Sequence, residues 1–190
     1  MREGHFDPKI APVLDSEERL RELRPYQLLK DKAGIKLGWT CIDLGSGTGT
    51  FSLRLLSCVG KEGTVYAVDD SAEMLDRIRA QNPPPNLVLV HGDVRRTGLE
   101  AGIADFCLLS SILHEVDRPD NLVAEAYRLL KPGGRVLALD WKAELDSPGP
   151  PQRRRLSREK VEKLLQQAGF INIEYSSWSR NYYIVLADKK

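Results

Sequence analysis

The sequence has few cysteines, no long apolar run and no excess of one charge, and each absence excludes a class of protein. Three of the 190 residues are cysteine, at Cys41, Cys58 and Cys107, which is too few and too scattered for a disulfide framework or a cysteine metal site. Apolar runs such as Leu87–Val90 and Val136–Leu139 are far shorter than the ~20 residues of a membrane span. The 28 basic and 27 acidic residues nearly cancel, so nothing favours a nucleic-acid partner. We therefore expect a cytoplasmic protein with no membrane span and no metal site.

What the sequence does contain is an alternation of two hydrophobic patterns. Near-continuous apolar segments are typical of parallel strands covered on both faces, and between them apolar residues recur every three or four positions, as in amphipathic helices. The length predicts one domain over residues 1–190, with an N-terminal helical cap over 1–34 and a core over 35–190. The expected parallel strands are Thr40–Leu44, Thr64–Val68, Leu87–Val90, Ala104–Ser110 and Arg135–Leu139.

The two ends of the chain depart from this alternation. Ser16–Lys32 predicts a helical cap that is broken near Pro25. After Gly169, the segments Ile171–Tyr175 and Tyr182–Leu186 follow each other with no helix between them, and such strands pair antiparallel. The sequence as a whole therefore predicts five βα units followed by a C-terminal β-hairpin, in one α/β domain.

A glycine-rich turn joins the first expected strand to the first helix, in the sequence Asp43-Leu44-Gly45-Ser46-Gly47-Thr48-Gly49. Glycine allows unusual backbone angles and lets a ligand come close to the chain, and the helix that follows favours a bound anionic group. Taken alone, the turn could serve the fold only. In an open parallel sheet, however, ligands bind at the carboxyl ends of the strands, where this turn lies.

Three acidic residues end three successive strands of the predicted sheet: Asp43, Asp69 and Asp93. A nicotinamide dinucleotide would explain Asp69, which would bind ribose hydroxyls, but its pyrophosphate would be repelled by the other two carboxylates. The expected ligand is therefore a nucleoside that carries positive charge and no diphosphate. S-Adenosylmethionine fits this description, because it offers an ammonium, a sulfonium, a ribose diol and an adenine amine.

These motifs together resemble the class I S-adenosylmethionine-dependent methyltransferases, in particular the small-molecule branch that includes the ubiquinone/menaquinone C-methyltransferases. The resemblance covers roughly residues 35–190 and implies a three-layer Rossmann-like α/β fold, with a mostly parallel seven-stranded sheet and a C-terminal antiparallel hairpin. The segments that carry it are Asp43–Gly49, Val68-Asp69, Ser71–Leu75, Gly92-Asp93 and Leu130–Gly134.

The resemblance also implies roles for residues of the cofactor site. Asp43 would hold the ammonium, Asp69 both ribose hydroxyls and Asp93 the adenine amine, and S-adenosylhomocysteine would be the product. Asp70 departs from the family, which usually has an apolar residue against the adenine. The remaining residues predicted to bind the cofactor are Gly45, Ser46, Gly47, Gly49, Met74, Gly92, Val94 and Ser110.

The acceptor of the methyl group is predicted to be a small molecule, methylated at carbon, oxygen or nitrogen. His114 is the candidate for acceptor contact or for a general base; the alternative is that it only hydrogen-bonds the loop that follows. In a loop before the last helix, Trp141 is a candidate for lining the acceptor site and Arg154 for binding an anionic group of the acceptor. The alternative for Arg153–Arg155 is that these residues only lead into the last helix and are exposed to solvent. Tyr26 in the cap is a further candidate wall.

Two alternative functions stay open at this point. One is a non-catalytic module that binds the nucleoside and regulates a partner, since the glycine turn indicates that a nucleoside is bound but not that a reaction is catalysed. The other is a nicotinamide-dependent oxidoreductase. Nothing in the sequence indicates the oligomeric state.

Overall fold

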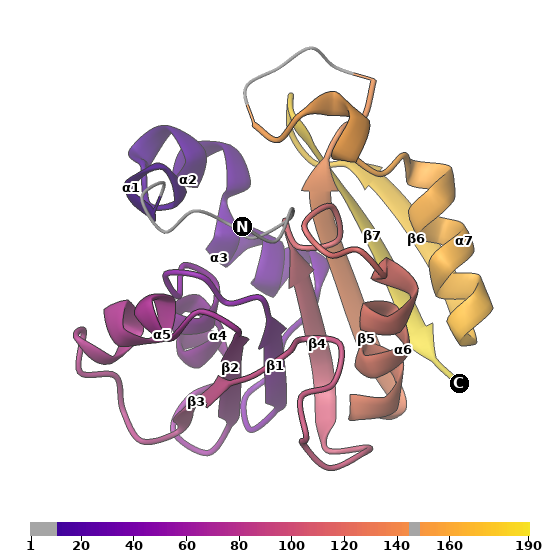
Figure 1. Ribbon diagram of the computed structural model, residues 1–190. Coiled ribbons are helices and arrows are strands. Elements are labelled where there is room, and N and C mark those ends of the chain that lie inside the picture. The colour runs from indigo at the N-terminus through magenta and orange to yellow at the C-terminus, as the bar shows by residue number, and fades with distance from the viewer. Residues whose placement is uncertain (1–10, 145–148) are drawn as a thin grey trace.

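The computed structural model describes residues 11–144 and 149–190 of the chain. Within them, seven strands form a single sheet in the order β3-β2-β1-β4-β5-β7-β6, and helices cover both of its faces (Figure 1). The strands are β1 Thr40–Leu44, β2 Thr64–Asp69, β3 Leu87–His91, β4 Ala104–Ser110, β5 Leu130–Trp141, β6 Phe170–Ser177 and β7 Tyr182–Lys189.

The pairing of the strands confirms the predicted fold class. Strands β1 to β5 pair in parallel, as expected from their continuous apolar sequences. Strand β7 pairs antiparallel with both β5 and β6, which confirms the C-terminal hairpin. The helices are α1 Ala11–Leu14, α2 Glu17–Leu23, α3 Pro25–Gln27, the π-helical segment η2 Leu28–Lys32, α4 Ser52–Val59, α5 Ala72–Arg79, α6 Pro119–Leu129, the 3₁₀ segment η3 Gln152–Arg154 and α7 Arg158–Ala168.

Two hydrophobic cores lie on the two faces of the sheet. On one face, α6 and α7 bury Leu122, Val161 and their apolar neighbours against the sheet. On the other face, α4, α5 and the end of the cap do the same with Leu55, Ile78 and Leu28. Because β1, β2 and β4 are covered on both sides, their side chains can be apolar at nearly every position, whereas the edge strand β3 has exposed residues.

The cap begins beside the carboxyl ends of the strands and ends on the α4 side of the sheet (Figure 1). Arg24, in the left-handed region at φ 45°, ends α2, and Pro25 starts the next turn, which confirms the predicted break. At this corner the Trp178 indole N–H donates to the Leu23 carbonyl at 2.6 Å, and Glu22 accepts from the Asn181 backbone N–H at 2.8 Å. The cap is therefore attached to the β6–β7 turn. Residues 1–10 of the predicted cap lie outside the described residues.

Two details of the predicted elements are wrong. The connection between β3 and β4, residues 92–103, contains turns and no helix, because three glycines fall within it and no helical apolar spacing is present. Among the described residues, four α-helices therefore lie between or after the parallel strands, rather than the helices of five βα units. Strand β5 begins at Leu130, not Arg135, since Leu130 already pairs with Ala104 ahead of a register shift in β4.

Candidate active site

A cavity of about 910 Å³ opens at the carboxyl ends of β1, β2 and β4, a size typical of small-molecule sites. It is lined by the glycine turn, by the loops after β2 and β3, by the segment between β4 and α6 and by two cap residues. The described lining residues are Leu14, Arg19, Asp43, Gly45, Ser46, Gly47, Thr48, Thr50, Phe51, Asp69, Asp70, Ser71, Met74, Asp93, Val94, Arg95, Ser110, Ser111, Ile112, Glu115, Val116 and Asp117.

The glycine turn is held against β2 by its own backbone. The N–H groups of Gly45 and Ser46 both donate to the Val68 carbonyl, at 2.9 and 3.0 Å. Gly45 has a φ of 83°, and a Cβ there would lie 2.8 Å from the Ile112 side chain. A side chain at this position would therefore be strained and would collide with the opposite wall of the cavity.

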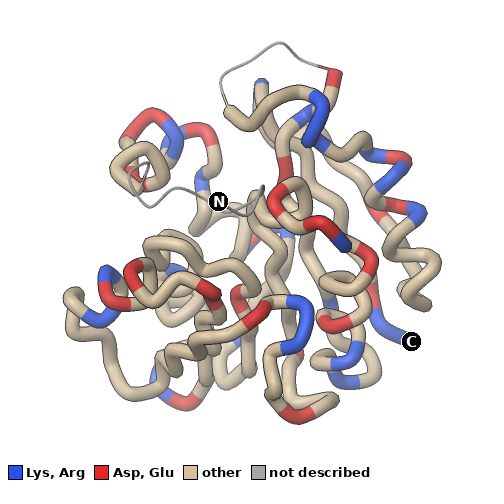
Figure 2. The backbone as a smooth tube through the Cα atoms, viewed as in Figure 1, with Lys and Arg blue, Asp and Glu red and all other residues tan. Residues whose placement is uncertain are grey.

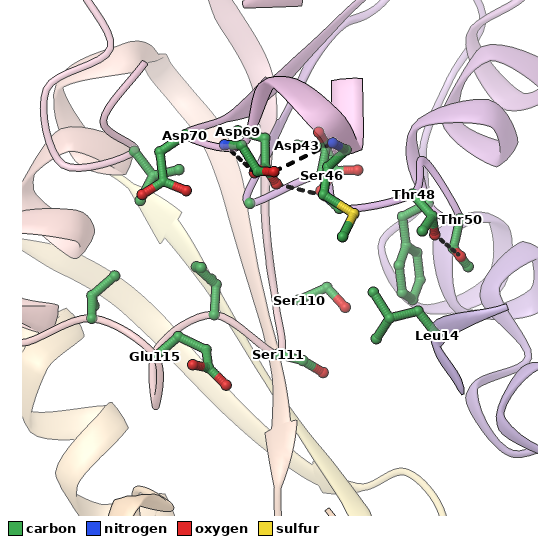
Figure 3. Close-up of a pocket in the computed structure, with 18 of the residues that line it drawn as sticks. Leu14, Asp43, Ser46, Thr48, Thr50, Asp69, Asp70, Ser110, Ser111 and Glu115 are labelled. Carbon is green, nitrogen blue, oxygen red and sulfur yellow. Dashed lines mark hydrogen bonds between the residues drawn. The ribbon is translucent and has the colours of Figure 1, made fainter. Parts of the chain in front are cut away.

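Asp69 sits at the end of β2 with each carboxylate oxygen bound to a backbone N–H. Gly47 donates to Oδ2 at 2.8 Å and Ser71 donates to Oδ1 at 2.9 Å. Figure 3 shows Asp69 on the same side of the cavity as Asp43 and Ser46. Burial raises the pKa of Asp69 and the two backbone hydrogen bonds lower it, with a net rise. A carboxylate can accept about four hydrogen bonds, so both oxygens retain capacity for hydroxyl groups of a ligand.

Asp43 is almost completely buried, with 1% of its surface exposed. Its Oδ2 accepts from the Ser52 hydroxyl at 2.6 Å, whereas Oδ1 has no hydrogen-bond partner within the described chain. Burial raises the pKa of Asp43 to about 7, the Ser52 hydrogen bond opposes this and the nearby Asp69 charge adds to it. The Ser46 and Ser111 hydroxyls on the same cavity are also buried and have no partner among the described residues. Buried polar atoms of this kind usually have partners, so this part of the cavity is suited to a polar, cationic ligand group.

Asp93 lies at the far side of the same cavity and is bound by Arg95. The Arg95 Nε–H and Nη2–H donate to the two carboxylate oxygens at 2.9 and 2.8 Å. These hydrogen bonds lower the pKa of Asp93. The pair is solvent-accessible, with 36% of the Arg95 side chain and 46% of the Asp93 side chain exposed.

The structure thus brings ten of the residues predicted to bind a cofactor to one cavity. They are Asp43, Gly45, Ser46, Gly47, Asp69, Asp70, Met74, Asp93, Val94 and Ser110. Gly49 and Gly92 are not among its described lining residues. Gly49 instead packs against α5, where a Cβ would lie 2.8 Å from the Ile78 side chain.

The residues predicted for the acceptor lie outside this lining set. His114 is buried behind the cavity, with 6% exposed. Trp141 packs on the Tyr182 ring at 4.3 Å between centroids, and Tyr26 is 48% exposed on the cap. Arg154 lies 3.9 Å from Glu115. The roles assigned to these four residues stay predictions.

His114 is bound on both sides by carboxylates. Its Nδ1 lies 2.6 Å from Asp140 Oδ1 and its Nε2 lies 3.0 Å from Glu115 Oε1. Burial alone would lower the pKa of His114, but the Asp140 charge and the hydrogen bonds to both carboxylates raise it to about 9. A pKa of about 9 favours the protonated ring at neutral pH, with Nδ1 hydrogen-bonded to Asp140 and Nε2 paired with Glu115.

Glu115 is one of the cavity residues that the sequence reasoning missed, together with Arg19, Arg95, Ser111 and Asp117. It follows His114 directly, and the ordinary pKa of histidine, near neutral pH, favours that residue over a glutamate as a candidate base. The signal in the sequence was the adjacency of two chemically complementary residues at the end of a strand.

Comparison with known proteins agrees with the geometry. Residues 42–138 match the family described as methyltransferase domain, and the chain belongs to this family. It is 35% identical, over 72% of its length and 62% of the relative's, to the 2-phytyl-1,4-naphtoquinone methyltransferase of Trichormus variabilis. It is 30% identical, over 62% of its length and 47% of the relative's, to the ubiquinone/menaquinone biosynthesis C-methyltransferase of Haemophilus ducreyi.

A solved structure resembles the whole chain. The crystal structure of a SAM-dependent methyltransferase from Aquifex aeolicus has a TM-score of 0.90 at 28% identity and covers 98% of this chain and all of its own. These findings confirm the resemblance to the S-adenosylmethionine-dependent methyltransferases. The chain spans about 62% of the length of the quinone methyltransferase relative.

Within the described residues, none of the helices combines the length and apolar character needed to cross a membrane. The same residues contain no cluster of His, Cys, Asp and Glu arranged to hold a metal ion.

Proposed function

We propose that the protein transfers a methyl group from S-adenosylmethionine to a small-molecule acceptor, in the cytoplasm, and that residues 35–190 form the core that binds the cofactor. The observation that carries the proposal is the convergence of Asp43, Asp69 and the glycine turn on one cavity, with Asp43 Oδ1 buried and unpartnered in the described chain. When bound, the cofactor supplies a methyl group that is already activated on a sulfonium.

Each of the three acidic residues of the cavity matches a different part of the cofactor. Asp43 would bind the ammonium, Asp69 the ribose hydroxyls, and Asp93 the adenine amine, since each offers a carboxylate to a donor. The Gly45–Gly49 backbone would pass along the methionine part. The contribution of the protein to the reaction is then chiefly to hold the acceptor in line with the methyl group.

A calorimetric titration separates this proposal from a nicotinamide-dependent oxidoreductase. S-Adenosylhomocysteine should bind more tightly than NAD, because the pyrophosphate of NAD would be repelled by the carboxylates of Asp43 and Asp93. Tighter binding of NAD would contradict the proposal.

A non-catalytic module is tested by incubation of the protein with methyl-labelled S-adenosylmethionine and small-molecule extracts. The absence of any labelled product, despite tight binding of the cofactor, would favour that alternative.

Replacing Arg95 by alanine should tighten the binding of S-adenosylhomocysteine by about two- to fivefold, the range of a solvent-exposed ion pair. Arg95 donates hydrogen bonds to both carboxylate oxygens of Asp93 and therefore competes with the adenine amine for this acceptor. The gain should shrink at high salt, which already weakens the ion pair. Arg96→Ala, at the neighbouring exposed position outside the cavity lining, serves as the control in the same titration. Weaker binding in Arg95→Ala would show that Arg95 contacts the cofactor instead.

A further inference from the structure

Glu115 faces the cavity from the side opposite the residues proposed to bind the nucleoside. It belongs to the segment between β4 and α6, together with Ser111. Figure 3 shows Glu115 and Ser111 across the open space from Asp43 and Asp69. The carboxylate of Glu115 is therefore placed to meet a second molecule rather than the ribose or the ammonium.

The position of Glu115 is fixed from behind. Its Oε1 lies 3.0 Å from Nε2 of the buried His114 ring, an ion pair when the ring is protonated, and Nδ1 of the same ring lies 2.6 Å from Asp140 Oδ1. Asp140 is fully buried, and its Oδ1 also accepts from the Trp141 backbone N–H at 2.8 Å. A carboxylate held in this way keeps its direction toward the cavity, which a freely rotating glutamate would not.

The second carboxylate oxygen of Glu115 is less occupied. Its Oε2 lies 3.9 Å from Arg154 Nη1, beyond the length of a hydrogen bond. Of the Glu115 side chain, 19% is exposed. The group can therefore still accept a hydrogen bond from a molecule in the cavity.

The charge of the cavity restricts which molecule that is. Six of the described lining residues are acidic and two are basic, and one of the two, Arg95, is already paired with Asp93. Figure 2 shows acidic positions both in the loops after β2 and β3 and in the segment between β4 and α6. A phosphate or carboxylate on the acceptor would be repelled by this lining. The acidic lining residues are Asp43, Asp69, Asp70, Asp93, Glu115 and Asp117.

We propose that Glu115 selects the acceptor, by accepting a hydrogen bond from an O–H or N–H group of a neutral or cationic molecule, and that His114 and Asp140 are positioning residues for it. The proposal rests on the proposed methyl transfer, since it assigns the acceptor side of the same cavity. It gives His114 a role other than general base.

The test uses four small aromatic probes on the full chain saturated with S-adenosylhomocysteine. Phenol and benzylamine carry a neutral and a cationic donor, whereas anisole has no donor and benzoate is an anion. Dissociation constants are measured by NMR, with the Glu115 carboxyl carbon labelled and assigned. Phenol and benzylamine should bind about tenfold more tightly than anisole and benzoate and should shift the Glu115 signal.

Three variants make the test specific. Glu115→Gln should weaken the preference against benzoate, because it removes one of the six acidic charges of the lining, and the matched control Glu100→Gln, at an exposed position outside the cavity lining, should retain it in full. His114→Gln should reduce the preference while the affinity for S-adenosylhomocysteine stays unchanged. A purely structural role of His114 would instead weaken cofactor binding and leave the preference intact.

Three results would overturn the proposal: equal binding of the four probes, no change at the Glu115 signal, or an unchanged preference in Glu115→Gln. If S-adenosylhomocysteine itself fails to bind the wild-type chain, the proposed function falls and this assignment falls with it. The two failures are thereby distinguished.

Discussion

Replacing Asp69 by alanine should weaken the binding of S-adenosylhomocysteine by roughly 2–4 kcal/mol, because two charge-assisted hydrogen bonds to the ribose would be lost. This corresponds to a factor of about 30 to 1000 in the dissociation constant. The variant also removes the acceptor of the Gly47 N–H, which loosens the glycine turn. Isothermal titration calorimetry at a fixed pH measures the effect.

A comparison of adenosine with 2′,3′-dideoxyadenosine isolates the ribose contact from the loosening of the turn. The wild type should prefer adenosine, and Asp69→Ala should bind the two nucleosides equally. Asp76→Ala, at an exposed position on α5 outside the cavity lining, should bind like the wild type. A preference for adenosine that survives in Asp69→Ala would contradict the assignment of the ribose.

The second large effect is expected at Asp43, where stability and binding should change in opposite directions. Asp43→Asn should stabilise the unliganded protein at pH 8 by on the order of 2–4 kcal/mol, because a neutral amide replaces a carboxylate that is costly to bury. The Ser52 hydroxyl can still donate to the amide oxygen. The same variant should bind S-adenosylhomocysteine about tenfold more weakly or worse, since the ammonium loses its counter-charge.

The pH dependence of this stabilisation follows from the raised pKa of Asp43. In the unfolded chain the carboxyl loses its proton near the ordinary pKa of 3.8, whereas in the folded protein it keeps the proton until about pH 7. The free energy of unfolding of the wild type should therefore fall as pH rises through this interval, and the contribution of Asp43 should be absent from Asp43→Asn.

Urea denaturation of both proteins at pH 5 and pH 8 measures the difference, and calorimetry measures the binding. A variant less stable than the wild type at pH 8 would contradict the burial argument. An unchanged affinity for S-adenosylhomocysteine would contradict the role of Asp43 toward the ammonium.

The sheet could be predicted from the sequence because its signals are local. Continuous apolar segments such as Ala104–Ser110 can fill only strands that are buried on both faces. The break at Pro25 and the stop at Gly169 follow from backbone geometry. The start of β5 could not be predicted, because Pro132 and the glycines after it indicate a turn locally, whereas pairing of Leu130 with Ala104 extends the strand.

The acidic side of the cavity was predictable for a similar reason. Once Asp43, Asp69 and Asp93 are placed at the ends of parallel strands, the topology brings them to one edge of the sheet. The pairing of His114 with Asp140 was not predictable, since the two residues are 26 positions apart and only the packing of β4 beside β5 brings them within 2.6 Å. The pairing of Arg95 with Asp93 was not predictable either: Arg95 is only two positions from Asp93 in the sequence, but the direction of its side chain depends on the conformation of the loop.

The position of β7 also affects the order in which the fold can be completed during synthesis. Strand β6 leaves the ribosome before β7, yet its only strand neighbour in the described sheet is β7. Until β7 is inserted, β5 presents an unpaired edge and β6 has no place in the sheet, a state prone to association with other chains. Shortening β7 should therefore lower the yield of folded protein in cells more than an equal deletion in the loop between β3 and β4.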